Sequence, residues 1–197
     1  INWAVINGET ETGVTTFFLD KDIDTGRIIL SKTFAIPDDA NVEYVYDGLM
    51  ALGADAAVET VDAMLQGNGE VPSMDQAPLA EGTELKPAPK IFKETCQIAW
   101  NQPAKRVYDF VRGLSPYPGS WTTLAPSGAV LKVYGAAKTG EATQEAPGTI
   151  SVSGHRLLVA TADEWLELKE VQMAGKKRMP ANAFLNGNRA IDESVCQ

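Results

Sequence analysis

The sequence has few of the residues that build metal centres, disulfide frameworks or membrane spans. Its 197 residues include two cysteines, Cys96 and Cys196, and one histidine, His155. Two cysteines so far apart match no metal-ligand spacing and no disulfide framework, so we expect free thiols and no metal site. No apolar run approaches the roughly 18 residues of a membrane-spanning helix, and the first residues lack the features of a signal peptide. These absences favour a cytoplasmic protein without a membrane partner.

Basic residues are also few, and they are distributed unevenly along the chain. The net charge is −9, which by itself argues against a nucleic-acid partner. Residues 1–85 hold 3 Lys and Arg against 16 Asp and Glu, and residues 86–197 hold 14 against 10. The first part therefore carries −13 and the second +4, so only the second part favours a polyanion.

A composition change falls at the same place as the change in charge. Between Gly67 and Pro89 the chain carries three glycines and four prolines with little apolar periodicity, as expected for an extended linker. We therefore predict three parts: a first domain over residues 1–67, a linker over 68–95 and a second domain over 96–197.

The first domain shows two strand patterns and one long helix pattern. Residues 13–19 and 27–34 are rich in β-branched and aromatic side chains, and the polar run 20–26 between them predicts a tight loop. Apolar residues then recur at helical spacing over 42–66, apart from one six-residue step between Leu52 and Val58. We expect one helix with a continuous apolar face, ended by Gly67.

The second domain predicts a short helix followed by five short strands. Pro103 suits a first helical position, and Val107, Phe110, Val111 and Leu114 form an apolar stripe. The strand patterns cover residues 121–124, 130–133, 149–152, 157–160 and 166–171. Five short strands at this spacing predict a small antiparallel, OB-like barrel.

The predicted loop of the first domain carries three aspartates. Turns favour aspartate for local backbone hydrogen bonds, so Asp24 alone would indicate no more than a turn. The surrounding residues change this interpretation, because they resemble the formyltetrahydrofolate-dependent formyltransferases. The segments that carry the resemblance are NGETETGVT at 7–15, DKDIDTG at 20–26 and IIL at 28–30. The resemblance implies that Asp24 is catalytic. It also implies that the loop borders the bound folate, through Leu19, Asp20, Lys21, Asp22, Ile23, Thr25 and Gly26.

The second half extends the resemblance to the methionyl-tRNA formyltransferase family. The segments that carry it are APKI at 88–91, IAW at 98–100, RGLSPYPGSWT at 112–122, APGTI at 146–150, AGKKRM at 174–179 and FLNG at 184–187. Ala99 departs from the pattern, because the family usually carries Asp there. The implied fold is an α/β remnant of a Rossmann-like formyltransferase domain, followed by the mostly β, OB-like barrel with short helices.

The family's catalytic Asn and His, and its Ser-Leu-Leu-Pro segment, belong upstream of the position that matches Ile1. We therefore expect that the chain begins inside a domain and that it has no formyltransferase activity alone. His155 lies in a polar turn between predicted strands and is expected at the surface rather than as a substitute.

The resemblance also implies the reaction and its partners. The formyl donor would be 10-formyltetrahydrofolate and the acceptor methionyl-initiator tRNA, with the protein acting as a monomer. Phosphate contacts need cations, and the candidates are Lys90, Lys105, Arg106, Lys176, Lys177 and Arg178. A solvated basic surface is the favoured explanation for the first three, and the two explanations weigh about equally for the last three.

Two alternatives stay open at this point. Relatives with the same two-domain plan formylate a sugar nucleotide or hydrolyse formyltetrahydrofolate, and Asp24 does not separate them. A non-catalytic OB-like nucleic-acid-binding module describes the second half but leaves the loop motif unexplained. The rings of Tyr117, Trp121 and Tyr134 resemble a base-stacking platform, yet we expect them mostly in the core or against the linker.

Overall fold

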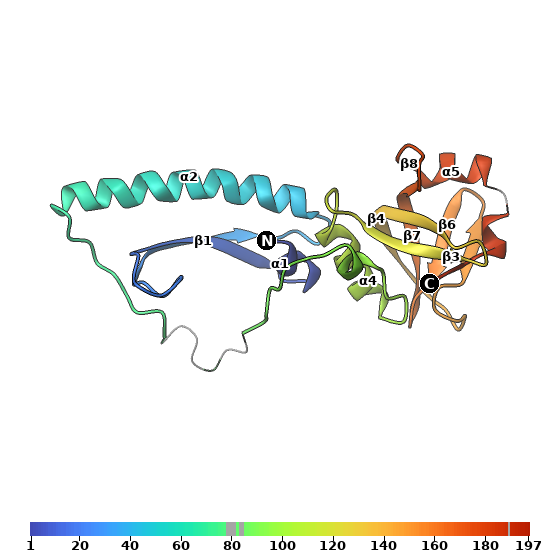
Figure 1. Cartoon of the computed structure of the whole chain (residues 1–197), viewed down its shortest axis with the longest axis horizontal. Coiled ribbons are helices and arrows are strands. Elements are labelled where there is room, and N and C mark those ends of the chain that lie inside the picture. The colour runs from blue at the N-terminus through green and yellow to red at the C-terminus, as the bar shows by residue number, and fades with distance from the viewer. Residues whose placement is uncertain (78–81, 83–84, 189) are drawn as a thin grey trace. The chain divides into compact units, whose positions relative to one another are not determined.

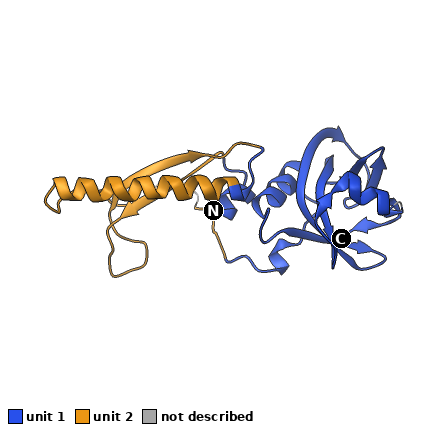
Figure 2. Ribbon diagram, turned by 90° about the horizontal axis from the view of Figure 1, so that it is seen from above, with its two compact units in different colours: residues 1–9, 39–43, 90–197 blue, residues 10–38, 44–89 orange. Residues whose placement is uncertain are grey.

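The computed structural model describes residues 1–77, 82, 85–188 and 190–197 (Figure 1). Its contacts divide the chain into two compact units that do not follow chain order (Figure 2). We call Thr10–Asp38 with Tyr44–Pro89 the hairpin–helix unit, and Ile1–Glu9, Asp39–Glu43 and Lys90–Gln197 the barrel unit. The functional boundaries expected after residues 67 and 95 stay a prediction.

The hairpin–helix unit contains the two predicted strands and most of the predicted long helix. Strands β1 (Glu11–Phe17) and β2 (Ile28–Ala35) pair antiparallel, from Glu11 opposite Ala35 to Phe17 opposite Ile28. Helix α2 (Val42–Gln66) has the predicted bounds and packs on this hairpin, where the hydroxyls of Thr16 and Thr60 lie 2.8 Å apart.

The expected continuous apolar face of α2 is wrong in its second half. Val58, Val61 and Leu65 are more than half exposed, whereas Ala56 and Thr60 are buried. The reason is the six-residue step from Leu52 to Val58, which turns the helix by about 600° and so brings Val58 to another face. Ala56, four residues after Leu52, continues the buried stripe instead.

The barrel unit is built on a curled antiparallel sheet. Its strands run in the order β5-β6-β7-β4-β3-β9, and β8 pairs with β7. A bridge between Thr149 and Val195 joins the two ends of this order, which confirms the expected barrel-like closure. The strands are β3 (Ser120–Ala125), β4 (Ala129–Ala142), β5 (Ile150–Ser153), β6 (Arg156–Ala160), β7 (Glu164–Met173), β8 (Met179–Pro180) and β9 (Val195–Cys196).

Short helices surround this sheet. Helix α4 (Ala104–Gly113) begins one residue later than predicted, since Pro103 caps it, and the carboxylate of Asp163 accepts a hydrogen bond from its first amide, Ala104. This bond lowers the pKa of Asp163. Sequence periodicity missed α5 (Ala181–Gly187), which is two turns long. The barrel unit also contains the short helices α1 (Asn2–Ile6), η1 (Glu94–Cys96) and η2 (Ile191–Glu193).

The barrel core is made of apolar side chains. Val107 and Val111 of α4 and Phe184 of α5 pack against inward-facing side chains of the sheet, such as Leu131 and Leu166. Both cysteines are free, as expected, and both are buried. Burial raises the pKa of Cys196 to about 12, so this thiol is a poor nucleophile at neutral pH. Within the described ranges, no helix combines the length and the apolar character that a bilayer crossing requires.

Candidate functional site: the Asp24 loop and the basic turn

The loop between β1 and β2 is closed tightly at its base. Phe17 pairs with Ile28, and the amide of Phe18 donates to the carbonyl of Arg27 at 2.9 Å. Residues 18–27, which we call the Asp24 loop, therefore start from a position fixed by the hairpin. A site carried on such a loop is held more firmly than one at a chain end.

Asp24 lies in the left-handed backbone region, with a φ of 59°. Aspartate is one of the few residues besides glycine that tolerates this conformation. The hydroxyl of Thr25 donates to the carbonyl of Asp22 at 3.1 Å, which stabilises the turn from within. Gly26 is buried, and a Cβ there would lie 1.5 Å from the carbonyl oxygen of Phe18, so only glycine fits.

A second segment, residues 73–76, holds the Asp24 loop from outside. The side-chain amide of Gln76 donates to the carbonyls of Asp24 at 2.9 Å and Gly26 at 2.7 Å. Met74 pairs with Ile28 through two backbone hydrogen bonds, and the Arg27 guanidinium contacts Ser73 and the carboxylate of Asp75. We call this segment the clamp.

Sequence reasoning assigned the clamp to the linker and missed its role. Residues 78–81 and 83–84 of that predicted linker lie outside the described residues. The polar residues Ser73, Asp75 and Gln76 are the only local signal, and they do not indicate which carbonyls they bind.

Replacing Gln76 by Ala tests the clamp. The change removes both hydrogen bonds to the loop, so we expect faster amide exchange over residues 18–27 and a loss of about 1 kcal/mol in the free energy of unfolding. Hydrogen exchange by mass spectrometry measures the first effect. Gln66→Ala, at the exposed end of α2, is the control, and equal exchange in both variants would show that Gln76 does not restrain the loop.

The backbone of the Asp24 loop is restrained while its side chains are open to solvent. Residues 19–25 are exposed, and the apolar side chains of Leu19 and Ile23 are 92% and 90% exposed. Exposed apolar side chains next to a carboxylate could cover a flat ring and present a proton acceptor to it. The structure thus gathers the eight predicted loop residues, 19–26, in one loop, and their ligand contacts stay a prediction.

The predicted cationic residues lie on three separate elements. Lys176, Lys177 and Arg178 belong to residues 174–178, which connect β7 to β8 and which we call the basic turn. Lys105 and Arg106 lie on α4, and Lys90 precedes η1 with its ammonium 5.4 Å from the Phe92 ring centre.

Several of these cations already have protein partners. Lys105 pairs with the buried carboxylate of Asp109, and Arg178 pairs with Glu170. The pairing with Glu170 raises the pKa of Arg178. Lys176 and Lys177 have exposed side chains, so the basic turn presents two cations to solvent.

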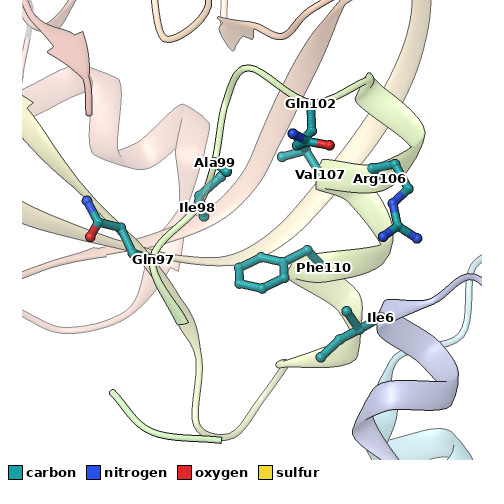
Figure 3. Close-up of a pocket in the computed structure, with 8 residues that line it drawn as sticks. All are labelled: Ile6, Gln97, Ile98, Ala99, Gln102, Arg106, Val107 and Phe110. Atoms are coloured by element: carbon teal, nitrogen blue, oxygen red, sulfur yellow. The ribbon is translucent and has the colours of Figure 1, made fainter. Parts of the chain in front are cut away.

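A small cavity of about 180 Å³ lies beside α4 (Figure 3). Ile6 and the α4 residues Arg106 and Phe110 lie on one side of it, and Ala99, where the family pattern has Asp, lies on the other. Among the described residues, the Arg106 guanidinium has no carboxylate partner. An aspartate at position 99, as in the family pattern, would place a carboxylate in the lining of this cavity, and Ala99 does not.

The predicted roles of the aromatic rings are confirmed in part. Trp121 packs near Ile91 and donates from its indole nitrogen to the carbonyl of Lys93 at 2.8 Å, so it contacts the predicted linker as expected. Tyr134 is partly buried. The expectation is wrong for Tyr117, which is 82% exposed, because it stands at the tip of a loop between two prolines. His155 is exposed in the turn between β5 and β6, as predicted.

Comparisons with known proteins match both halves of the chain. The family model described as "Formyl transferase" matches residues 1–61, and "Formyl transferase, C-terminal domain" matches residues 90–189. The chain is 51% identical over 191 residues to the methionyl-tRNA formyltransferase of Bacteroides fragilis, covering 95% of this chain and 58% of that protein. It is 49% identical over 197 residues to the methionyl-tRNA formyltransferase of Parabacteroides distasonis, covering 98% and 60%.

The fold matches solved structures as well. HypX from Aquifex aeolicus, solved in complex with tetrahydrofolic acid, superposes with a TM-score of 0.66 at 18% identity, over 96% of this chain and 32% of that one. The chain spans about 58–60% of the length of the curated relatives described above. From the two family models and these identities, this chain is a member of the formyl transferase family.

Proposed function

We propose that this sequence belongs to an enzyme that transfers a formyl group from 10-formyltetrahydrofolate to the α-amino group of methionine on initiator tRNA. The observation that carries the proposal is the identity of about 50%, across nearly the whole chain, to proteins named methionyl-tRNA formyltransferase. The aligned region covers 98% of the chain for the second of these proteins and so spans both the Asp24 loop and the basic turn. The fold and its cavities alone would not distinguish this reaction from the reactions of other proteins with the same fold.

The chemistry is an acyl transfer through a tetrahedral intermediate. The neutral amine attacks the formyl carbon, a new C–N bond forms, and the bond from that carbon to folate N10 then breaks. The amine loses one proton and N10 gains one, so a proton acceptor near the amine is required. A donor for the developing oxyanion is also required.

Asp24 suits the proton-handling part of this reaction. Its carboxylate is carried on a loop whose backbone is restrained by the hairpin and by Gln76. In the family that the sequence resembles, the matching aspartate orients a histidine and a water that relays protons. The folate would lie against the exposed apolar side chains of Leu19 and Ile23. A tetrahydrofolate complex of the structural neighbour HypX supports a folate-type donor.

An acceptor assay tests the proposal. A complete enzyme that contains this sequence should transfer labelled formyl from 10-formyltetrahydrofolate to methionyl-initiator tRNA. Transfer to an amino-sugar nucleotide, or release of free formate, should be far slower. Preferential formylation of the sugar nucleotide, or hydrolysis alone, would reject the assignment in favour of the related activities.

Charge reversal in the basic turn tests the tRNA interface. We expect Lys176→Glu with Lys177→Glu to raise the KM for tRNA about tenfold or more and to flatten its dependence on salt, because fewer counterions are released on binding. Turnover at saturating tRNA should change little. Steady-state kinetics at several salt concentrations measure both effects.

Lys169→Glu is the control for this experiment, because Lys169 is exposed on β7 and pairs with Glu167. It should affect the KM for tRNA less than Lys177→Glu alone. Equal effects of the two single variants would mean that net charge, and not the basic turn, sets the affinity.

A further inference from the structure

The loop of residues 115–119 presents one aromatic ring on a restrained backbone. The hydroxyl of Ser115 donates to the carbonyl of Tyr134 at 2.6 Å, and the amide of Gly119 donates to the carbonyl of Leu114 at 2.8 Å. Gly119 has a φ of 85°, and a Cβ there would lie 2.9 Å from the Tyr134 ring. Between these fixed ends Tyr117 is 82% exposed, so its ring is open while its backbone is held.

The same Tyr134 holds the basic turn. The guanidinium carbon of Arg178 lies 4.2 Å from the centre of the Tyr134 ring, which is a cation–π contact. The Tyr134 hydroxyl donates to the Gln172 side-chain oxygen at 2.9 Å, and the Gln172 amide donates to the carbonyl of Lys176 at 2.7 Å. One residue of β4 therefore contacts both the Tyr117 loop and the residues that order the basic turn.

This arrangement combines two features by which proteins bind unpaired nucleotides. An exposed aromatic face stacks with a base of any type, and nearby cations neutralise the phosphates. Bases inside a tRNA stem are already paired and stacked, so a protruding ring suits only an unpaired nucleotide. The unpaired nucleotides next to the reacting amino group are those at the 3′ end of the tRNA.

We infer that Tyr117 stacks on an unpaired base at the 3′ end of the tRNA while Lys176 and Lys177 contact its phosphates. This inference rests on the proposed function and adds to it a residue and a part of the substrate. The hydroxyl of Tyr117 is not required for stacking, but the ring is. Tyr117→Phe and Tyr117→Trp are therefore functional, and Tyr117→Ala is impaired.

The experiment measures binding of the 197-residue chain to initiator tRNA that carries 2-aminopurine in place of its terminal adenine. Stacking on an aromatic ring should quench the 2-aminopurine fluorescence on binding. We expect Tyr117→Ala to lose the quenching and to raise the Kd about tenfold. Tyr117→Phe should keep the quenching and the affinity of the unaltered chain. Tyr46→Ala, which removes an exposed ring of α2, should bind like the unaltered chain. A tRNA shortened by its unpaired 3′ nucleotides should bind Tyr117→Ala and the unaltered chain equally.

The outcomes separate this inference from the proposed function. If the unaltered chain binds tRNA and Tyr117→Ala leaves affinity and quenching unchanged, the stacking role is overturned and the proposed function stands. An equal loss of affinity for full and shortened tRNA would overturn the assignment to the 3′ end. If neither the unaltered chain nor a complete enzyme that contains it shows affinity for either tRNA, the inference and the tRNA part of the proposed function both fail.

Discussion

In a complete formyltransferase that contains this sequence, Asp24→Asn should lower turnover by about 10²- to 10⁴-fold, the usual contribution of a positioned acid or base. Asparagine removes the negative charge and the proton acceptor but has nearly the same shape. It also tolerates the left-handed backbone that Asp24 adopts, with φ 59°, so the loop should keep its conformation. Alanine at this position would confound the loss of the carboxylate with backbone strain.

Steady-state kinetics and thermal unfolding together decide this prediction. The KM for the folate and the melting temperature should change little, because the carboxylate is exposed and the folate would contact the loop mainly through other residues. Asp22→Asn removes the same charge from the same loop and should lower turnover far less. Turnover of Asp24→Asn within about threefold of the unaltered enzyme would reject a catalytic role for Asp24.

The parts that could be predicted from the sequence depend on local patterns. Runs of β-branched and aromatic residues predicted β1 and β2, helical spacing predicted α2, and strand patterns predicted the barrel strands of residues 120–173. Each of these signals lies within a few residues of the structure it specifies. The position of Asp24 between two strands followed from the same local patterns.

The parts that could not be predicted depend on contacts between distant residues. Gln76 binds the carbonyl of Asp24 across 52 positions, and nothing in the segment around Gln76 indicates that partner. The exposure of Tyr117 was missed for the same reason. Aromatic rings are usually buried, and the residues around Tyr117 do not indicate that its loop is anchored on Tyr134.

Arg112 is a further case, because the motif that contains it indicated a family but not a physical role. In the structure its guanidinium nitrogen Nε donates to the carboxylate of Asp109 at 2.8 Å, and Nη1 donates to the carbonyl of Ala40 at 2.8 Å. Asp109 and Arg112 are 1% and 6% exposed. The pair therefore connects α4 to residues 39–43, within the barrel unit and just before α2.

Arg112→Met should lower the free energy of unfolding by about 2–3 kcal/mol, because it removes the buried cation that pairs with Asp109 and leaves that buried carboxylate with Lys105, whose side chain is 47% exposed. Methionine keeps much of the apolar volume, so the loss should come from the charge rather than from a cavity. Urea unfolding of the chain measures the change. Arg156→Met, which breaks the ion pairs with Glu141 and Glu167 at the barrel surface, should lower the free energy of unfolding far less.

The double variant Asp109→Leu with Arg112→Met separates the cost of an unpaired charge from the value of the pair. Replacing both members by apolar residues removes the buried charge, so it should recover most of the stability that Arg112→Met loses. Recovery would also show that the Ala40 carbonyl contributes less than the carboxylate to holding Arg112. If the double variant is as unstable as Arg112→Met, the hydrogen bond to Ala40 is the dominant interaction, and the connection between α4 and residues 39–43 depends on it.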